Sequence, residues 1–229
     1  MRIIFVRHGY PDYKLDCLTE VGHQHAEAAA VRLADEPFKR IFSSTCGRAV
    51  ETAEHIAAKH DLPIESFDFM REIKWGPIEG DSLPYKNGYP WVVVDGMVED
   101  NDSLLDPNWM EEGKFANNSV KFLIQDIGEE FDKLLAELGY VREGNFYRVV
   151  KKSDDTVAMV SHGGSSSAAL AHLFNLPFPF VCQSIRPLFT AITVVSLSGE
   201  EGRLISPRFE IVNDSRHIKQ IGHEVYFGT

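Results

Sequence analysis

Cysteine is scarce in this chain. The three cysteines among 229 residues, Cys17, Cys46 and Cys182, lie far apart in the sequence. Their number and spacing match neither a zinc-binding pattern nor a disulfide framework, so free thiols are expected. No cysteine is followed six positions later by an arginine, which excludes the cysteine-based phosphatases. A nucleotide-binding P-loop pattern is also missing.

Long apolar runs and positive charge are scarce as well. No apolar run approaches the roughly 18 residues that span a bilayer. Met1 leads directly into a short apolar segment, without a signal-peptide pattern. With 23 Lys and Arg against 34 Asp and Glu, the net charge is −11, which argues against nucleic acid or a membrane surface as the main partner. We expect a cytoplasmic protein; the sequence sets no oligomeric state.

Apolar segments alternate with helical patterns in the first third of the chain. Residues 2–6 and 40–43 are predicted strands. Thr19 is expected to cap the helix after the first strand. A hydroxyl group among residues 43–45 is expected to cap the helix after the second strand. The segment 60–63 ends this second helix at a proline. This order predicts an α/β fold: three α/β/α layers with a mainly parallel central sheet.

The middle of the chain has a different character. Residues 81–118 are rich in Pro, Gly, Asn and Asp and contain several aromatic side chains, so we expect a lid-like insertion over the sheet edge rather than a linker. Ser119 is expected to cap a long helix that ends at Gly139. The aromatic side chains in and beside the insertion are interpreted as packing residues; they are Trp75, Tyr85, Trp91 and Trp109.

Later strands are expected at 145–150, 156–161, 191–197 and 203–212, with a helix after Gly164. The length suits one domain. We therefore predict a single domain over residues 1–229, with an insertion at about 81–155.

Two histidines each follow a buried strand and precede a glycine. Arg7-His8-Gly9 comes after the first strand, and His162-Gly163-Gly164 comes after residues 157–161. Ligands of open α/β sheets bind beyond the carboxyl ends of the strands, so the two imidazoles are expected to meet there. Helix N-termini favour phosphate, glycines let the backbone approach closely, and Arg48 adds a cation in a first helical turn. The set predicts a site that handles a phosphoryl group.

In their order along the chain, these segments resemble the motifs of the histidine phosphatase superfamily, which includes the phosphoglycerate mutases. The matching segments are the triplet Arg7-His8-Gly9, the helix opening at 18–22, the second arginine motif at 43–53, the acid-bearing segment at 72–80 and the second histidine motif at 161–164. Five motifs in family order make a specific match. It covers most of the chain except about 81–155.

The resemblance implies roles for the basic residues. Neutral His8 attacks phosphorus and becomes a phosphohistidine, which water later cleaves. Arg7 and Arg48 bind phosphate oxygens in bidentate fashion. His162, taken as protonated, adds a third donor next to the Gly163 backbone, and this positive charge stabilises the transferring phosphoryl group.

The resemblance also implies an acid. Glu72 would protonate the departing alkoxide and then activate water, with Glu79 and Asp81 left open as alternatives. No metal and no cofactor is expected. The expected partner is a small phosphorylated substrate.

The chain departs from the family pattern at two places. His25 stands where the family usually carries glutamine, and residues 10–13 lack the asparagine usual in the mutases. The second departure favours a phosphatase, acting on phosphomonoesters without a metal, over a mutase.

Two other functions fit the sequence less well. Gly80-Asp81-Ser82-Leu83 resembles the tetrapeptide that names one esterase family, and Asp214 with His217 resembles its acid–base pair. The segment before Ser82 is a poor strand, which disfavours this serine esterase. A non-catalytic binding module is disfavoured because the predicted catalytic residues are all present.

Overall fold

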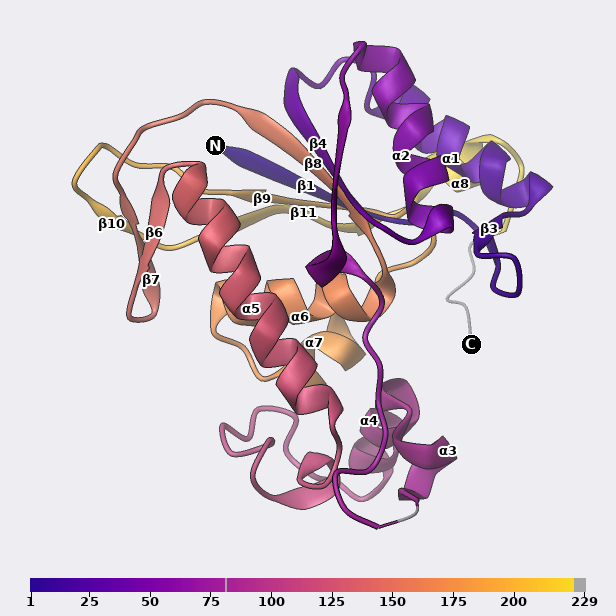
Figure 1. Cartoon of the computed structure of the whole chain (residues 1–229), viewed down its shortest axis with the longest axis vertical. Coiled ribbons are helices and arrows are strands. Elements are labelled where there is room, and N and C mark those ends of the chain that lie inside the picture. Colours follow the sequence, from indigo (N-terminus) through magenta and orange to yellow (C-terminus); the bar gives the residue numbers. More distant parts are fainter. Residues whose placement is uncertain (81, 225–229) are drawn as a thin grey trace.

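The computed structural model describes residues 1–80 and 82–224. Its centre is a six-stranded sheet of order β11-β9-β1-β8-β4-β5 (Figure 1). The strands are β1 (Arg2–Arg7), β4 (Phe38–Ser44), β5 (Ile64–Phe67), β8 (Thr156–Ser161), β9 (Ile192–Ser196) and β11 (Arg208–Asp214). β9 is antiparallel to both of its neighbours, β1 and β11, and the other neighbouring pairs are parallel. The predicted α/β class with a mainly parallel sheet is confirmed.

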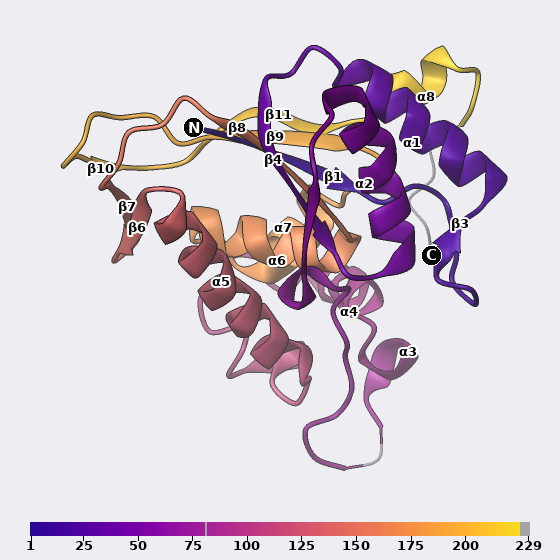
Figure 2. The same cartoon turned by 45° about the horizontal axis from the view of Figure 1, so that its top comes forward.

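Helices cover both faces of this sheet (Figure 2). α1 (Glu20–Arg32), α2 (Gly47–His60) and α8 (Arg216–Gln220) lie on one side. α5 (Val120–Glu137), α6 (Gly163–Phe174) and α7 (Phe178–Ser184) lie on the other. Alternation along β1 explains the two layers, since Ile4 and Val6 pack with the first group while Ile3 and Phe5 pack with the second.

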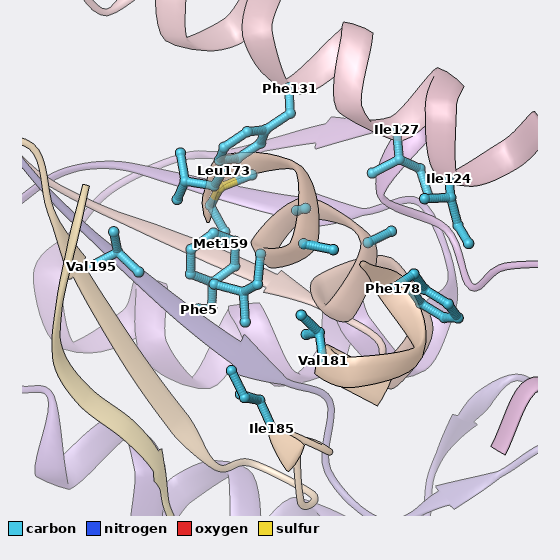
Figure 3. Packing of buried hydrophobic residues seen from close by; sticks show 14 of the residues in the cluster. Phe5, Ile124, Ile127, Phe131, Met159, Leu173, Phe178, Val181, Ile185 and Val195 are labelled. Carbon is cyan, nitrogen blue, oxygen red and sulfur yellow. The ribbon is translucent and has the colours of Figure 1, made fainter. Parts of the chain in front are cut away.

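The core under α5 is built from both ends of the chain. Phe5 and Met159 of the sheet face Phe131 of α5 and Leu173 of α6 (Figure 3). The rings of Phe5 and Phe131 lie 6.0 Å apart. The range 81–155 therefore supplies a helix to the main hydrophobic cluster, and the proposed division into domain and insertion stays a prediction.

The part of that range before α5 lies below the sheet in Figure 1. It contains α3 (Pro84–Gly88), α4 (Pro90–Glu99) and a 3₁₀ turn at Gly113–Phe115. After α5, β6 (Tyr140–Glu143) and β7 (Phe146–Val149) form a hairpin that pairs with β10 (Leu204–Ile205). The predicted strand 203–212 is thus two strands in different sheets. In the described part of the chain, no helix is both long and apolar enough to cross a bilayer.

Two predicted helix caps are wrong and one is confirmed. The Thr19 hydroxyl accepts from the Gly22 N–H at 3.1 Å, as predicted. At α5 the cap is the Asn118 side chain, which accepts from the Val120 N–H at 3.1 Å, because Ser119 already has helical backbone angles. None of the three hydroxyl groups at residues 43–45 caps α2. The N-cap residue of α2 is Cys46, whose side chain makes no capping hydrogen bond.

Candidate active site

The carboxyl ends of neighbouring parallel strands bring the two histidines together. β1 and β8 pair in register, with Arg7 opposite Ser161, so His8 and His162 emerge at one edge. Their ring centroids lie 5.0 Å apart, and both side chains are buried. The predicted meeting of the imidazoles is what the structure shows.

His8 is held in one tautomer. Its Nδ1 lies 2.7 Å from the Gly9 carbonyl oxygen, which only accepts, so Nδ1 carries the proton. Nε2 therefore presents its lone pair and accepts from Arg48 Nε at 3.3 Å. Burial, and then the charges of His162, Arg7 and Arg48, hold the pKa of His8 well below its usual value. The ring is neutral, as a nucleophile must be.

Arg48 depends on an acid that the sequence reading did not identify. Asp16 pairs through one carboxylate oxygen with Arg48 Nη1, and its other oxygen accepts from the Gly47 N–H at 2.9 Å. Asp16 thus replaces the missing side-chain cap of α2 and offsets the unfavourable placement of a cation in the first turn. It follows the short hairpin strand β2 (Pro11–Asp12) and precedes β3 (Cys17–Leu18).

Arg7 is fixed by the segment before β9. Its Nη1 donates to the Pro187 carbonyl at 2.8 Å, and its guanidinium lies 4.0 Å from the Phe189 ring centroid. The Thr190 N–H donates to the Arg7 carbonyl at 3.0 Å. Both the backbone and the side chain of this arginine are therefore positioned before any anion arrives.

His162 is held by a hydroxyl group of a neighbouring strand. Its Nε2 lies 2.8 Å from Ser44 Oγ, at the end of β4. Burial, then Arg48, Arg7 and Arg71, hold its pKa well below the usual value. Burial beside these arginines disfavours the protonated form, and the expected protonated state of His162 stays a prediction. A phosphate dianion would raise this pKa.

Glu72 lies against the first turn of α6. Its Oε1 accepts from the Gly164 and Ile73 N–H groups, each at 2.9 Å. Burial raises the pKa of Glu72, and Arg7 opposes that rise. A Cβ at Gly164 would lie 2.4 Å from this oxygen, so only glycine permits the approach. A carboxyl that keeps its proton more readily suits a general acid.

The other two candidate acids are placed differently or not described. Glu79 is exposed, and its backbone bonds to the Asn117 side chain. It does not line the cavity that contains Glu72. Asp81 lies outside the described residues.

Glu72 and Arg7 line a cavity of about 290 Å³. Tyr13, Ile73, Trp75, Lys86, Tyr89, Trp91 and Gly163 complete its lining. The interpretation of the aromatic residues as packing therefore fits only some of them. Trp109 is buried against Phe115 and Phe178, as expected, whereas Trp75 and Trp91 face the cavity.

The three residues of the esterase alternative do not meet. Asp214 pairs with Arg32 and Arg216, and His217 is buried with Nε2 3.1 Å from Thr190 Oγ1. Ser82 is exposed in the segment before α3. In both views, α3 lies well away from α8, which carries His217 and lies next to α1 (Figures 1 and 2).

Comparison with known proteins identifies the family of this site. Residues 3–91, which carry the Arg7 triplet, Arg48 and Glu72, match the model of the histidine phosphatase superfamily (branch 1). Over these residues the chain is similar to the histidine phosphatase superfamily. This confirms the family that the motif order indicated, and the family model together with phosphatase relatives supports a phosphatase enzyme.

Among the relatives of this chain is a glucosyl-3-phosphoglycerate phosphatase of Mycobacterium tuberculosis. It is 26% identical over 185 residues, which cover 77% of this chain and 76% of that protein. A phosphoserine phosphatase from Entamoeba histolytica, solved with 3-phosphoglyceric acid, has 22% identity and a TM-score of 0.62, covering 95% of this chain and 98% of that one. A putative alpha-ribazole-5'-P phosphatase from Escherichia coli has 18% identity and a TM-score of 0.61, covering 94% and 98%. These two structures show the fold.

Proposed function

We propose that this chain hydrolyses small phosphomonoesters through a phosphohistidine on His8. The observation that carries the proposal is the state of His8: neutral, with its proton on Nδ1, and with Nε2 directed at Arg48 next to His162. A lone pair fixed among cationic groups attacks phosphorus while those groups bind its oxygens.

The reaction takes two displacements. Nε2 of His8 forms a bond to phosphorus as the bond from phosphorus to the alcohol oxygen breaks, and Glu72 gives its proton to that oxygen. Water then forms a bond to phosphorus as the bond to Nε2 breaks, and its proton passes to Glu72. Arg7, Arg48, His162 and the Gly163 N–H hold the phosphoryl oxygens in both steps. The proposal includes no metal ion and no cofactor.

The named activities of the relatives favour a small phosphorylated metabolite as substrate. Mutase-type transfer between two positions of a phosphoglycerate is the second candidate, which the absent asparagine at 10–13 disfavours. We propose no nucleic acid and no membrane as a partner of this protein. The proposal places the protein in the cytoplasm, which the three free thiols favour.

A panel of phosphomonoesters assayed with EDTA present tests the function. We expect inorganic phosphate to be released at an unchanged rate in EDTA. Loss of turnover in EDTA would indicate a metal enzyme instead. Interconversion of phosphoglycerate isomers at a rate equal to hydrolysis would favour the mutase. Carboxylester hydrolysis that disappears in Ser82→Ala would support the esterase.

Glu72→Gln tests the acid. We expect kcat to fall about 10²–10⁴-fold for alkyl phosphates, since the alkoxide then leaves without a proton. The fall in the rate of phosphoenzyme formation should be much smaller for 4-nitrophenyl phosphate, whose leaving group is stable as an anion. Pre-steady-state release of the alcohol from both substrates measures this difference. Glu79→Gln is the matched control, and an equal loss in that variant, or an equal loss with both leaving groups, would exclude Glu72 as the acid.

A further inference from the structure

One wall of the cavity beside Glu72 is aromatic. The ring centroids of Trp75 and Tyr89 lie 4.8 Å apart, and Tyr89 and Trp91 stack at 6.0 Å with an interplanar angle of 18°. Trp75 is 39% exposed, and Tyr13 across the site is 60% exposed. Large aromatic surfaces left open at a cavity bind a flat apolar partner, which gains stacking and burial there.

A cation lies on the same wall. Lys86 Nζ is 5.3 Å from the Tyr89 ring centroid, and Lys86 and Arg7 are the two cations that line this cavity. Among the ion pairs of the residues that the structure describes, none includes Lys86. Arg7 is proposed to hold the phosphate, so Lys86 is available to a second anionic group.

Lys86 is presented by a strained turn. Tyr85, Lys86 and Asn87 have φ of 56°, 53° and 57°, three consecutive left-handed residues that are not glycine. Asn87 Oδ1 accepts from the Leu83 N–H at 3.0 Å and closes the turn. Such backbone persists where surrounding contacts fix it, and it is concentrated at binding sites.

A second cavity lies on the other side of a wall formed by Tyr13, Glu72, Ile73 and Trp75. It has a volume of about 600 Å³ and is lined by the cations Arg48, Arg71 and Lys74. Its remaining lining residues, Asp16 and Cys46, add no aromatic surface. This wide cavity competes for an anionic group, but it lacks the stacked wall that a ring requires.

Volume limits what fits the aromatic side. About 290 Å³ is at the lower end of the range of about 300–1,000 Å³ typical of ligand pockets. One ring with a short substituent fits a cavity of this size.

We propose, building on the phosphatase function above, that the preferred substrate is a phosphomonoester whose alcohol contains one flat apolar ring bearing an acidic group. The ring packs against Trp75 and Tyr89, and the acidic group binds Lys86. Trp75, Tyr89 and Lys86 are thus specificity-determining residues.

Four phosphomonoesters separate the effect of the ring from that of the acidic group. 4-Carboxybenzyl phosphate has both, and benzyl phosphate has only the ring. 3-Phosphoglycerate has only the acidic group, and ethyl phosphate has neither. We expect 4-carboxybenzyl phosphate to have the highest kcat/KM. Lys86→Gln should lower the ratio of kcat/KM for 4-carboxybenzyl over benzyl phosphate about tenfold, the size of a lost charge-assisted hydrogen bond. Trp75→Leu should lower kcat/KM for both ring substrates about tenfold relative to ethyl phosphate, since stacking is lost.

Lys74→Gln is the matched control, because it removes the same charge from the neighbouring cavity; we expect that ratio to change less than twofold. The proposal is overturned if 3-phosphoglycerate or ethyl phosphate is hydrolysed as well as 4-carboxybenzyl phosphate. It is also overturned if Lys74→Gln, rather than Lys86→Gln, lowers the ratio.

Binding of non-hydrolysable 4-carboxybenzylphosphonate, measured by calorimetry, separates this proposal from the proposed function. Binding that weakens about tenfold in Lys86→Gln, in a protein that hydrolyses none of the four esters, would contradict the phosphatase function and support the pocket. Hydrolysis of all four esters at equal kcat/KM would support the function and contradict the pocket.

Discussion

Replacement of His8 by alanine is expected to lower kcat/KM for every phosphomonoester substrate on the order of 10⁴-fold or more, as loss of a covalent nucleophile does in other enzymes. The cationic groups around the phosphate would remain, but nothing would take the place of Nε2. The His8 ring is buried, with Arg48 Nε on one side and the Gly9 carbonyl on the other. The alanine side chain at this position carries no nucleophilic atom that could attack phosphorus.

Rapid quenching with ³²P-labelled substrate measures the intermediate directly. The wild-type chain should carry label that is lost in acid and retained in alkali, as expected of a phosphorus–nitrogen bond. The label should be absent from His8→Ala. His23→Ala is the control, since His23 lies on α1 and bonds to His55 at 3.1 Å; its turnover and labelling should equal those of the wild type.

Three outcomes would contradict this mechanism. Turnover that persists in His8→Ala would exclude His8 as the nucleophile. Label retained on His162 in that variant would reverse the assignment of the two histidines. Label stable in acid would indicate an oxygen ester instead of a phosphohistidine. Near-ultraviolet circular dichroism of the variant shows whether the core around the site is intact.

The parts of the site that were predicted from sequence depend on local pattern. A short apolar strand followed by a glycine places its next side chain at the sheet edge, and parallel strands share that edge. Arg7, His8 and His162 obey this rule. No knowledge of distant contacts was needed for any of them.

The parts that were missed depend on contacts between distant segments. Asp16 pairs with Arg48 from a turn in which the φ of Asp16 is 54°. No periodicity of the sequence predicts this turn. The wall of Trp75, Tyr89 and Trp91 forms only when the start of α4 packs against Trp75 on one side and α7 on the other. Burial and three arginines from other segments lower the pKa of His162, an effect that the motif alone does not show.

Arg48→Gln tests the electrostatics that follow from these contacts. We expect kcat/KM to fall about 10²–10³-fold, the usual effect of removing one preorganised donor to a developing negative charge. Asp16→Asn should give a smaller loss, because Arg48 keeps its charge and loses only its carboxylate partner. Arg216→Gln, an exposed arginine on α8, is the control and should leave kcat/KM unchanged.

The pH dependence of kcat/KM distinguishes this role from a structural one. Arg48 lowers the pKa of His8, and it also lowers the pKa of Glu72. Its removal therefore raises both pKa values. Since the reaction uses neutral His8, the acid limb should move to higher pH, and since it uses protonated Glu72, the alkaline limb should move the same way. A loss of kcat/KM with both limbs unmoved would show that Arg48 stabilises the fold without acting on the charge of either group.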